Sequence, residues 1–482
     1  MHRIGRGCWK DRARRAVRHA GVGTAGVAGL ALLAGCGSFL GLDETGSGGF
    51  APPDPVIAVS KDYVVETVNR RTRIWKRDTP TTLVADFDTS GQFFALGNTC
   101  SGNGFSDPRV RFDFSSRRWF LAATETGTPG RWCLAVSQSE NPTAGWFFYA
   151  FQPPPAWFGP EIGYQPVFPD YPGLGVGERT VTLTGNLAHG FFGLAQVEQS
   201  AILVVNKADL EHGANPHAAY FAPPNATTDG PLFLLQPANN YGGFQPGWES
   251  VTAGVNVLAD PGRFLRLQVV TGVPTDGVIP FLTKVGIAVA ANKPFRQPPD
   301  ARQPGPGTIA ANDERVLDVQ ARAGFLWVAL HQGCEPPGDV DGVGNPIRRV
   351  CARYLEIDPT TFVLRQDFKV IAPKRYFYYP ALALDSAGNL LTAFDASSET
   401  EYPSVYLTGR AAADPPNTLH GLYQVRAGSA GYRDSRHRWG DYSGGAPEDP
   451  LAGQGAWFST EFPLDAVHWA TYNGTIHANE YR

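Results

Sequence analysis

Acidic side chains stand near the start of six strand-like segments along this chain. They are Asp54, Asp107, Asp170, Glu249, Asp313 and Asp441. If these segments meet around one axis, their carboxylates form a ring whose repulsion must be relieved by a metal ion, an arginine or a proton. Calcium is matched by such hard oxygen ligands, with Asp54, Asp107 and Asp170 as candidates. The alternatives are caps on turns, or ion pairs with four nearby arginines, which are Arg109, Arg179, Arg315 and Arg438.

A cation, aromatic rings, an acid and a flexible turn are combined in "RWGDYSGG", residues 438–445. In a hydrolase, Asp441 would act as general acid or base, and Tyr442 as its stacking or nucleophilic partner. Asp107 and Arg109, in the segment "DPRV", are the other catalytic candidates. The simpler interpretation places Trp439 in the core and makes Asp441 a cap of its turn.

A second acidic pattern, "GDVDGVGN" at residues 338–345, alternates oxygen-bearing side chains as a calcium loop does. Asp339 and Asp341 are its metal candidates, although the distal bidentate glutamate of an EF-hand is missing. The loop lies between Cys334 and Cys351. A surface loop closed by a disulfide therefore explains the pattern equally well.

The elements that would position these residues form a repeat. The six acidic segments and a seventh, which starts at Tyr379, follow one another at intervals of 53 to 79 residues. Each opens with a β-hairpin and continues with further strand-like runs, which is the size of a four-stranded propeller blade with long loops. We therefore predict an all-β chain with one β-propeller domain over residues 52–482. Seven blades are expected, and six are the alternative because the unit at Glu249 is the least regular.

The N-terminal residues predict export. A basic stretch leads into an apolar run that is too short to span a bilayer comfortably, and the run ends in "LAGC" at residues 33–36. This ending is typical of the bacterial lipoprotein signal, in which the cysteine is lipidated and the preceding peptide is removed. We expect a signal peptide at 1–35, a lipid anchor on Cys36 and a flexible tether at 36–51, with the protein at an outer membrane, on its periplasmic or cell-surface side. An ordinary secretory peptide is the alternative.

The charge of the chain limits its possible partners, and its cysteines predict disulfides. Residues 1–35 carry seven Lys or Arg and one Asp, so their removal changes the formal charge from −4 to −10. Such an acidic body argues against nucleic acid as a partner. In an oxidising compartment the remaining cysteines are expected to form disulfides, and sequence proximity favours Cys100 with Cys133 and Cys334 with Cys351. We expect a monomer.

Several segments together resemble a known group of proteins. "DPRVRFDFSSRRWFLAA", "FPDYPGLGVG" and "RWGDYSGG" are similar to segments of exported bacterial β-propeller proteins of the sialidase-like superfamily. The resemblance is specific for this group but not for an activity. Our first hypothesis is a binding or interaction scaffold for glycan or another envelope component. The alternative is a glycoside hydrolase or polysaccharide lyase that uses carboxylate, tyrosine and arginine residues at the channel mouth. No motif here assigns the arginine triad or the Tyr/Glu pair of a sialidase, so no catalytic residue is transferred.

Overall fold

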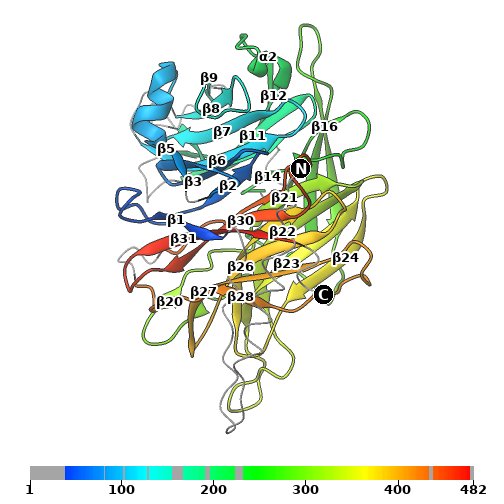
Figure 1. The fold of residues 1–482 in the computed structure, drawn as a ribbon. Helices are drawn as coiled ribbons and strands as arrows, with labels where there is room; N and C mark the ends of the chain where they lie inside the picture. The colour runs from blue at the N-terminus through cyan, green and yellow to red at the C-terminus, as the bar shows by residue number, and fades with distance from the viewer. Residues whose placement is uncertain are drawn as a thin grey trace.

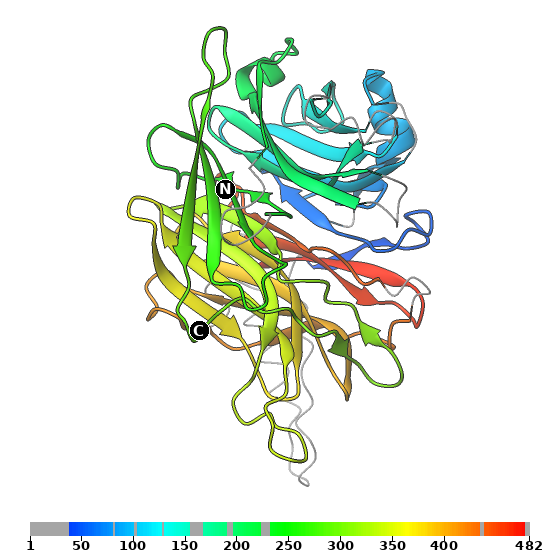
Figure 2. The ribbon, with the colours of Figure 1, turned by 180° about the vertical axis from the view of Figure 1, so that it is seen from behind.

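The computed structural model describes residues 38–80, 82–100, 104–127, 130–154, 167–189, 196–222, 232–433 and 438–477. The chain is all-β, and its sheets form a seven-bladed propeller (Figures 1 and 2). The predicted fold and blade number are therefore confirmed. The proposed signal peptide and Cys36 lie outside the described residues. Among the residues that are described, no helix combines the length and apolar character needed to cross a membrane.

The first three blades are regular four-stranded antiparallel sheets, numbered from the innermost strand outward. Blade 1 consists of β2 (Val56–Val59), β3 (Tyr63–Val68), β4 (Arg71–Lys76) and β5 (Leu83–Asp88). Blade 2 consists of β6 (Phe105–Asp113), β7 (Arg118–Glu125), β8 (Arg131–Ser137) and β9 (Trp146–Phe151). Blade 3 consists of β10 (Val167–Val176), β11 (Thr180–His189), β12 (Gln196–Asn206) and β13 (Ala218–Phe221).

The next three blades include the irregular one. Blade 4 consists of β14 (Gln236–Pro237), β16 (Trp248–Val255), β17 (Phe264–Thr271) and β18 (Phe281–Ala288). Blade 5 consists of β21 (Val316–Arg322), β22 (Phe325–Cys334), β23 (Arg349–Asp358), β24 (Val363–Val370) and the short parallel strand β15 (Asn239–Asn240). Blade 6 consists of β25 (Tyr376–Leu384), β26 (Leu390–Ser398), β27 (Glu401–Arg410) and β28 (Tyr423–Arg426).

Blade 7 closes the ring with strands from both ends of the chain. It consists of β29 (Gly444–Pro447), β30 (Ala456–Pro463), β31 (Trp469–Ile476) and the N-terminal strand β1 (Phe39–Asp43). Blue β1 lies beside red β31 in Figure 1. The expected flexible tether at 36–51 is therefore wrong over β1, because this segment covers the edge of the last blade and pairs its backbone with β31.

Within the described residues, a few short helices and strands lie outside the blades. Short elements are η1 (Thr89–Phe93), η2 (Phe94–Gly97), α2 (Lys207–Glu211) and the pair β19 (Ala301–Arg302) with β20 (Thr308–Ile309). The chain pairs Cys100 with Cys133 in blade 2, and Cys334 with Cys351 between β22 and β23.

Glycine in the innermost strands lets neighbouring blades approach each other. A Cβ on Gly175 of β10 would lie 2.7 Å from the Ala238 carbonyl oxygen, beside blade 4. A Cβ on Gly444 of β29 would lie 2.7 Å from the Ile57 nitrogen of blade 1. Only a residue without a side chain fits so close to another backbone. The glycines of "DYPGLGVG" and "DYSGG" are therefore required by packing around the axis.

Candidate functional site

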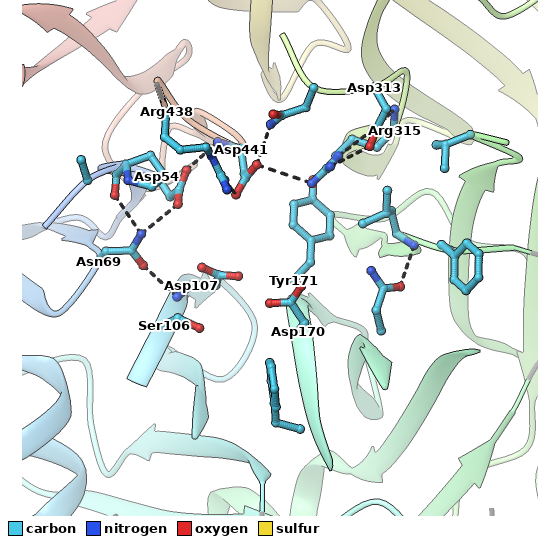
Figure 3. A pocket seen from close by; sticks show the side chains of 18 of the residues that line it. Asp54, Asn69, Ser106, Asp107, Asp170, Tyr171, Asp313, Arg315, Arg438 and Asp441 are labelled. Atoms are coloured by element: carbon cyan, nitrogen blue, oxygen red, sulfur yellow. Dashed lines mark hydrogen bonds and ion pairs between the residues drawn. The ribbon is translucent and has the colours of Figure 1, made fainter. Parts of the chain in front are cut away.

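The innermost strands open onto a cavity of about 660 Å³ at one end of the channel (Figure 3). Five carboxylates line it, and they are Asp54, Asp107, Asp170, Asp313 and Asp441. Arg315 and Arg438 contribute positive charge, and part of the wall is aromatic, from Phe50, Phe105, Phe168 and Phe233. We call this cavity and its lining residues the mouth.

Glu249 does not belong to the mouth, although its segment resembles the other six. It lies on β16, the second strand of blade 4, and forms an ion pair with Arg179, whose side chain is 59% exposed. The innermost strand of this blade is β14, which has only two residues. The alternating pattern that begins at Glu249 therefore belongs to a different strand position, and the sequence repeat was misaligned here.

The backbone turns into each blade in a recurring way. Six blades are preceded or opened by a residue with positive φ, and these residues are Asp54, Asp107, Tyr171, Leu234, Asn312 and Tyr379. Four of them stand before proline, in the pairs 54–55, 107–108, 171–172 and 379–380. Because proline has no N–H to give to a sheet, the ladder register can shift at this point. The left-handed residue, rather than the acid, is the repeated feature.

Side chains from preceding blades hold these turns in place. Asn69 Oδ1 accepts from the Asp107 N–H at 2.8 Å, and Asn186 Oδ1 accepts from the Leu234 N–H at 2.9 Å. His331 Nδ1 accepts from the Tyr379 N–H at 3.0 Å, while its Nε2 donates to the Ala311 carbonyl at 2.7 Å. Burial lowers the pKa of His331 to about 4, which keeps the ring neutral. These three residues were not predicted as site residues, although Asn69 directly follows the second strand of its blade, and Asn186 and His331 lie within theirs.

Two of the mouth carboxylates are paired with arginine. Arg315 donates from Nε and Nη2 to the two oxygens of Asp313, both at 2.7 Å. Burial alone would raise the pKa of Asp313, but the Arg315 guanidinium holds it below its usual value. Arg438 pairs with Asp441, and Asn312 donates to the same carboxylate at 2.7 Å. Both arginines of the mouth are thus paired with a carboxylate, although Arg438 Nε has no hydrogen-bond partner within the described residues.

Asp54 connects three blades. Its carboxylate accepts from the Asp441 N–H at 2.6 Å and from Asn69 Nδ2 at 2.8 Å. Burial and the charge of Asp441 raise the pKa of Asp54 to about 7. Asp54 is thus a cap that fixes blades 7, 1 and 2 relative to one another, because Asn69 also holds Asp107.

Asp107 and Asp170 are the carboxyls with unused bonding capacity. Asp107 is 9% exposed, and within the described part of the chain its carboxyl has no hydrogen bond or ion pair. Burial, followed by the charges of Asp170 and Asp54, raises the pKa of Asp107 well above its usual value. The pKa of Asp170 is also raised, by burial and by Asp441. Figure 3 shows both side chains at the centre of the mouth.

Below these carboxyls the channel is packed. The Arg109 guanidinium lies 3.3 Å from the centre of the Tyr442 ring and 5.4 Å from that of Tyr171. Its Nε donates to the Pro172 carbonyl at 2.8 Å. Arg109 and Tyr442 are 2% and 0% exposed, and neither lines the mouth. Of the four catalytic candidates, the structure therefore brings Asp107 and Asp441 to the mouth and places Arg109 and Tyr442 beneath it.

In the loop at residues 338–345, both aspartate carboxylates accept hydrogen bonds from the protein itself. Asp339 receives two bonds from Arg349, at 2.7 and 3.0 Å, and both side chains are buried. Asp341 accepts from the backbone N–H groups of Val343 and Asn345 and from the Asn345 amide. These bonds hold the turn, so this loop does not present a free ring of oxygens to calcium.

Comparisons with known proteins give no assignment. No family model and no curated protein matches the sequence. Among solved structures, an apocarotenoid oxygenase from Synechocystis is 10% identical with a TM-score of 0.41, and the match covers 76% of this chain and 71% of that one. A quinohemoprotein alcohol dehydrogenase from Pseudomonas putida is 9% identical with a TM-score of 0.37, covering 88% and 66%. A Trypanosoma rangeli sialidase is 9% identical with a TM-score of 0.35, covering 78% and 56%.

Proposed function

We propose that this chain is an envelope-anchored propeller that binds a hydroxyl-rich ligand, such as a glycan, at the mouth. One observation carries the proposal: carboxyls with unused bonding capacity face a cavity whose wall is partly aromatic. Carboxylates accept hydrogen bonds from sugar hydroxyls, and aromatic faces stack against sugar rings. A cavity of this size is also in the range of small-molecule sites.

The charges of the mouth favour a neutral or cationic ligand over an anionic one. A sialic acid carboxylate would need arginines that are free to bind it, whereas Arg315 and Arg438 are bonded to Asp313 and Asp441. Arg109 lies between tyrosine rings below the cavity. This arrangement speaks against sialidase chemistry in the mouth, since the positive charge of each arginine is already shared with a carboxylate or with tyrosine rings.

The proposed lipid anchor would set the orientation of the propeller relative to the membrane. Only Gly37 and Ser38 separate Cys36 from β1, and β1 runs toward residues 50–52, which line the mouth. The start of β1 is therefore at the end of blade 7 away from the mouth. A lipid on Cys36 would hold that end against the membrane, and the mouth would face away from it.

Glycan binding can be tested directly on the full chain in detergent, with immobilised polysaccharides. We expect a bound polysaccharide whose affinity falls in Phe50→Ala and Asp107→Asn. Phe281→Ala is the matched control, because Phe281 is 67% exposed and does not line the mouth. The proposal fails if no polysaccharide binds, or if binding is the same in both mouth variants as in the control.

The proposed orientation of the mouth can be tested on protein that is bound to lipid vesicles. Leu258 lines the mouth and Leu451 lies between β29 and β30, at the opposite end, and they are 67% and 70% exposed. We expect a bulky maleimide to label Leu258→Cys faster than Leu451→Cys. Faster labelling of Leu451→Cys would reverse the proposed orientation.

A second function, glycoside cleavage, is favoured by one observation. The pKa of Asp107 is raised well above its usual value by burial and by neighbouring acids, as a general acid requires. The test is release of reducing ends or unsaturated sugars from a polysaccharide panel. Product that disappears in Asp107→Asn and Asp441→Asn, with unchanged thermal unfolding, supports the enzyme, and binding without product supports the scaffold.

A further inference from the structure

The carboxyl of Asp107 is unusual among the buried acids at the mouth. It is nine-tenths buried, yet nothing in the described ranges donates a hydrogen bond to it or pairs with it. The Ser106 hydroxyl, next to it on β6, is 7% exposed and also has no hydrogen-bond partner in the described chain. Both residues line the same cavity, and Figure 3 shows them together. Buried polar groups almost always have a partner, so the unpartnered Ser106 hydroxyl, beside the Asp107 carboxyl that lines the cavity, indicates a ligand that binds there.

The protein's own cations do not fill this role. Arg315 and Arg438 are engaged by Asp313 and Asp441 on the far side of the mouth. Arg109 lowers the pKa of Asp107 from a distance, but its nitrogen donates to the Pro172 carbonyl instead. When both are ionised, Asp107 and Asp170 thus face each other with excess negative charge, which a proton or a cation between them relieves.

The available atoms define the class of cation. Asp107 and Asp170 supply carboxylate oxygens and Ser106 a hydroxyl oxygen, while the described residues that line the cavity include no histidine or cysteine. Hard oxygen ligands with no nitrogen or sulfur suit calcium and similar ions. The cavity also leaves room for water or ligand oxygens to complete the shell of six to eight that calcium takes.

We propose that Asp107, Asp170 and Ser106 bind a calcium-class divalent cation at the centre of the mouth. This inference rests on the proposed function of the mouth as the ligand-binding end, and it adds that vicinal hydroxyls of a glycan complete the coordination of the ion. The cation neutralises the two carboxylates and gives the Ser106 hydroxyl its missing partner.

Terbium luminescence is the direct test, because Tb³⁺ replaces Ca²⁺ in oxygen sites and nearby tyrosine can sensitise its emission. Tyr171 is adjacent to Asp170 and lines the mouth. With the full chain in detergent, we expect sensitised emission that Ca²⁺ competes away. Asp107→Asn and Asp170→Asn are each expected to weaken Tb³⁺ binding by about tenfold or more, because they remove ligand charge. Ser106→Ala is expected to weaken it less.

Asp341→Asn is the matched control, since Asp341 belongs to the other acidic loop and caps its own turn. The inference is overturned if the wild-type chain binds neither Tb³⁺ nor Ca²⁺, if both mouth variants bind as wild type, or if only Asp341→Asn loses emission. Thermal unfolding of each variant shows whether a loss reflects the site or the fold. Asparagine at position 107 or 170 removes repulsion, so we expect both variants to fold.

Glycan binding measured with and without EDTA separates this inference from the proposed function. Binding that is lost in EDTA and restored by Ca²⁺ supports both. Glycan binding that persists in EDTA overturns the role of the ion in coordination and leaves the proposed function intact. Ca²⁺ binding at Asp107 and Asp170 without any glycan contradicts the proposed function and leaves the metal site standing.

Discussion

Two groups of acids meet at blade 7 and behave differently. At the mouth, Asp107 faces a cavity without a partner. In the interior, a buried acidic cluster consists of Asp395, Glu461 and Glu66, all 0% exposed. Asp395 accepts from Trp439 Nε1 at 2.9 Å and from the Thr460 hydroxyl, and Glu66 accepts from Thr471, Ser459 and the Leu42 N–H.

Both groups contain carboxyls with raised pKa values, so this property alone does not mark a functional site. Burial raises the pKa of Asp395 to about 8 and that of Glu66 above its usual value, although neither lines the mouth. The difference is access to a cavity, because both carboxyl oxygens of Glu461 also lack a hydrogen-bond partner within the described residues, but Glu461 does not line the mouth. Side chains of the protein donate hydrogen bonds to Asp395, whereas the Asp107 carboxyl is available to a ligand that enters the cavity.

The largest effect should come from the buried cluster. Asp395→Ala leaves the Trp439 N–H and the Thr460 hydroxyl buried without an acceptor, which should lower the free energy of unfolding by about 3 kcal/mol. Thermal or urea unfolding measures the loss. Asp395→Asn keeps an acceptor oxygen and serves as the control. A loss in Asp395→Asn as large as in Asp395→Ala would show that the hydrogen bonds are not the cause.

The pH dependence of stability should also come from the interior. The pKa of Asp395 is raised to about 8 in the folded chain and is near 3.8 when unfolded. Below pH 4 both states hold the proton, and between pH 4 and 8 only the folded state does, so the free energy of unfolding falls over this range and levels off above pH 8. Between pH 6 and 8 this one group should cost about 2 kcal/mol. The fall should be smaller in Asp395→Asn, and an identical slope would contradict the assignment.

At the mouth, removal of charge should have a small and opposite effect on stability. Asp107→Asn takes away repulsion with Asp170 and Asp54 and breaks no hydrogen bond of the side chain within the described ranges. In EDTA we expect the variant to be as stable as wild type or more stable, by up to about 1 kcal/mol. A large loss of stability would mean that Asp107 has a structural role like that of Asp395.

The smallest effect is expected in the exposed acidic loop, outside both groups. Asp341→Asn keeps the side-chain oxygen that accepts from Val343 and Asn345. The free energy of unfolding, measured by thermal unfolding, should change by no more than about 0.5 kcal/mol. A larger change, or one that depends on added Ca²⁺, would show that this loop holds a cation after all.

Some features of the channel could be read from sequence and some could not. The repeat spacing predicted seven blades, and the acids at Asp54, Asp107 and Asp441 mark true blade openings. Glu249 was misleading because β16 has the same alternating pattern as an innermost strand, while the real one, β14, is two residues long. A strand that short carries no periodicity, and Leu234 before it lacks the proline found at four other openings.

The sequence by itself determined the all-β class, the repeated unit and the acidic character of the body, because alternation, turn residues and charge are local properties. Only the tertiary structure decided which acids share a cavity and which are satisfied. In the sequence, Asp107 and Asp395 are both aspartates and nothing distinguishes them. The residues that form hydrogen bonds with them lie 38 to 65 positions away, and they are Asn69, Trp439 and Thr460. The packing of neighbouring blades brings these partners together, with Asn69 in blade 1 beside Asp107 in blade 2, and Trp439 and Thr460 in blade 7 beside Asp395 in blade 6.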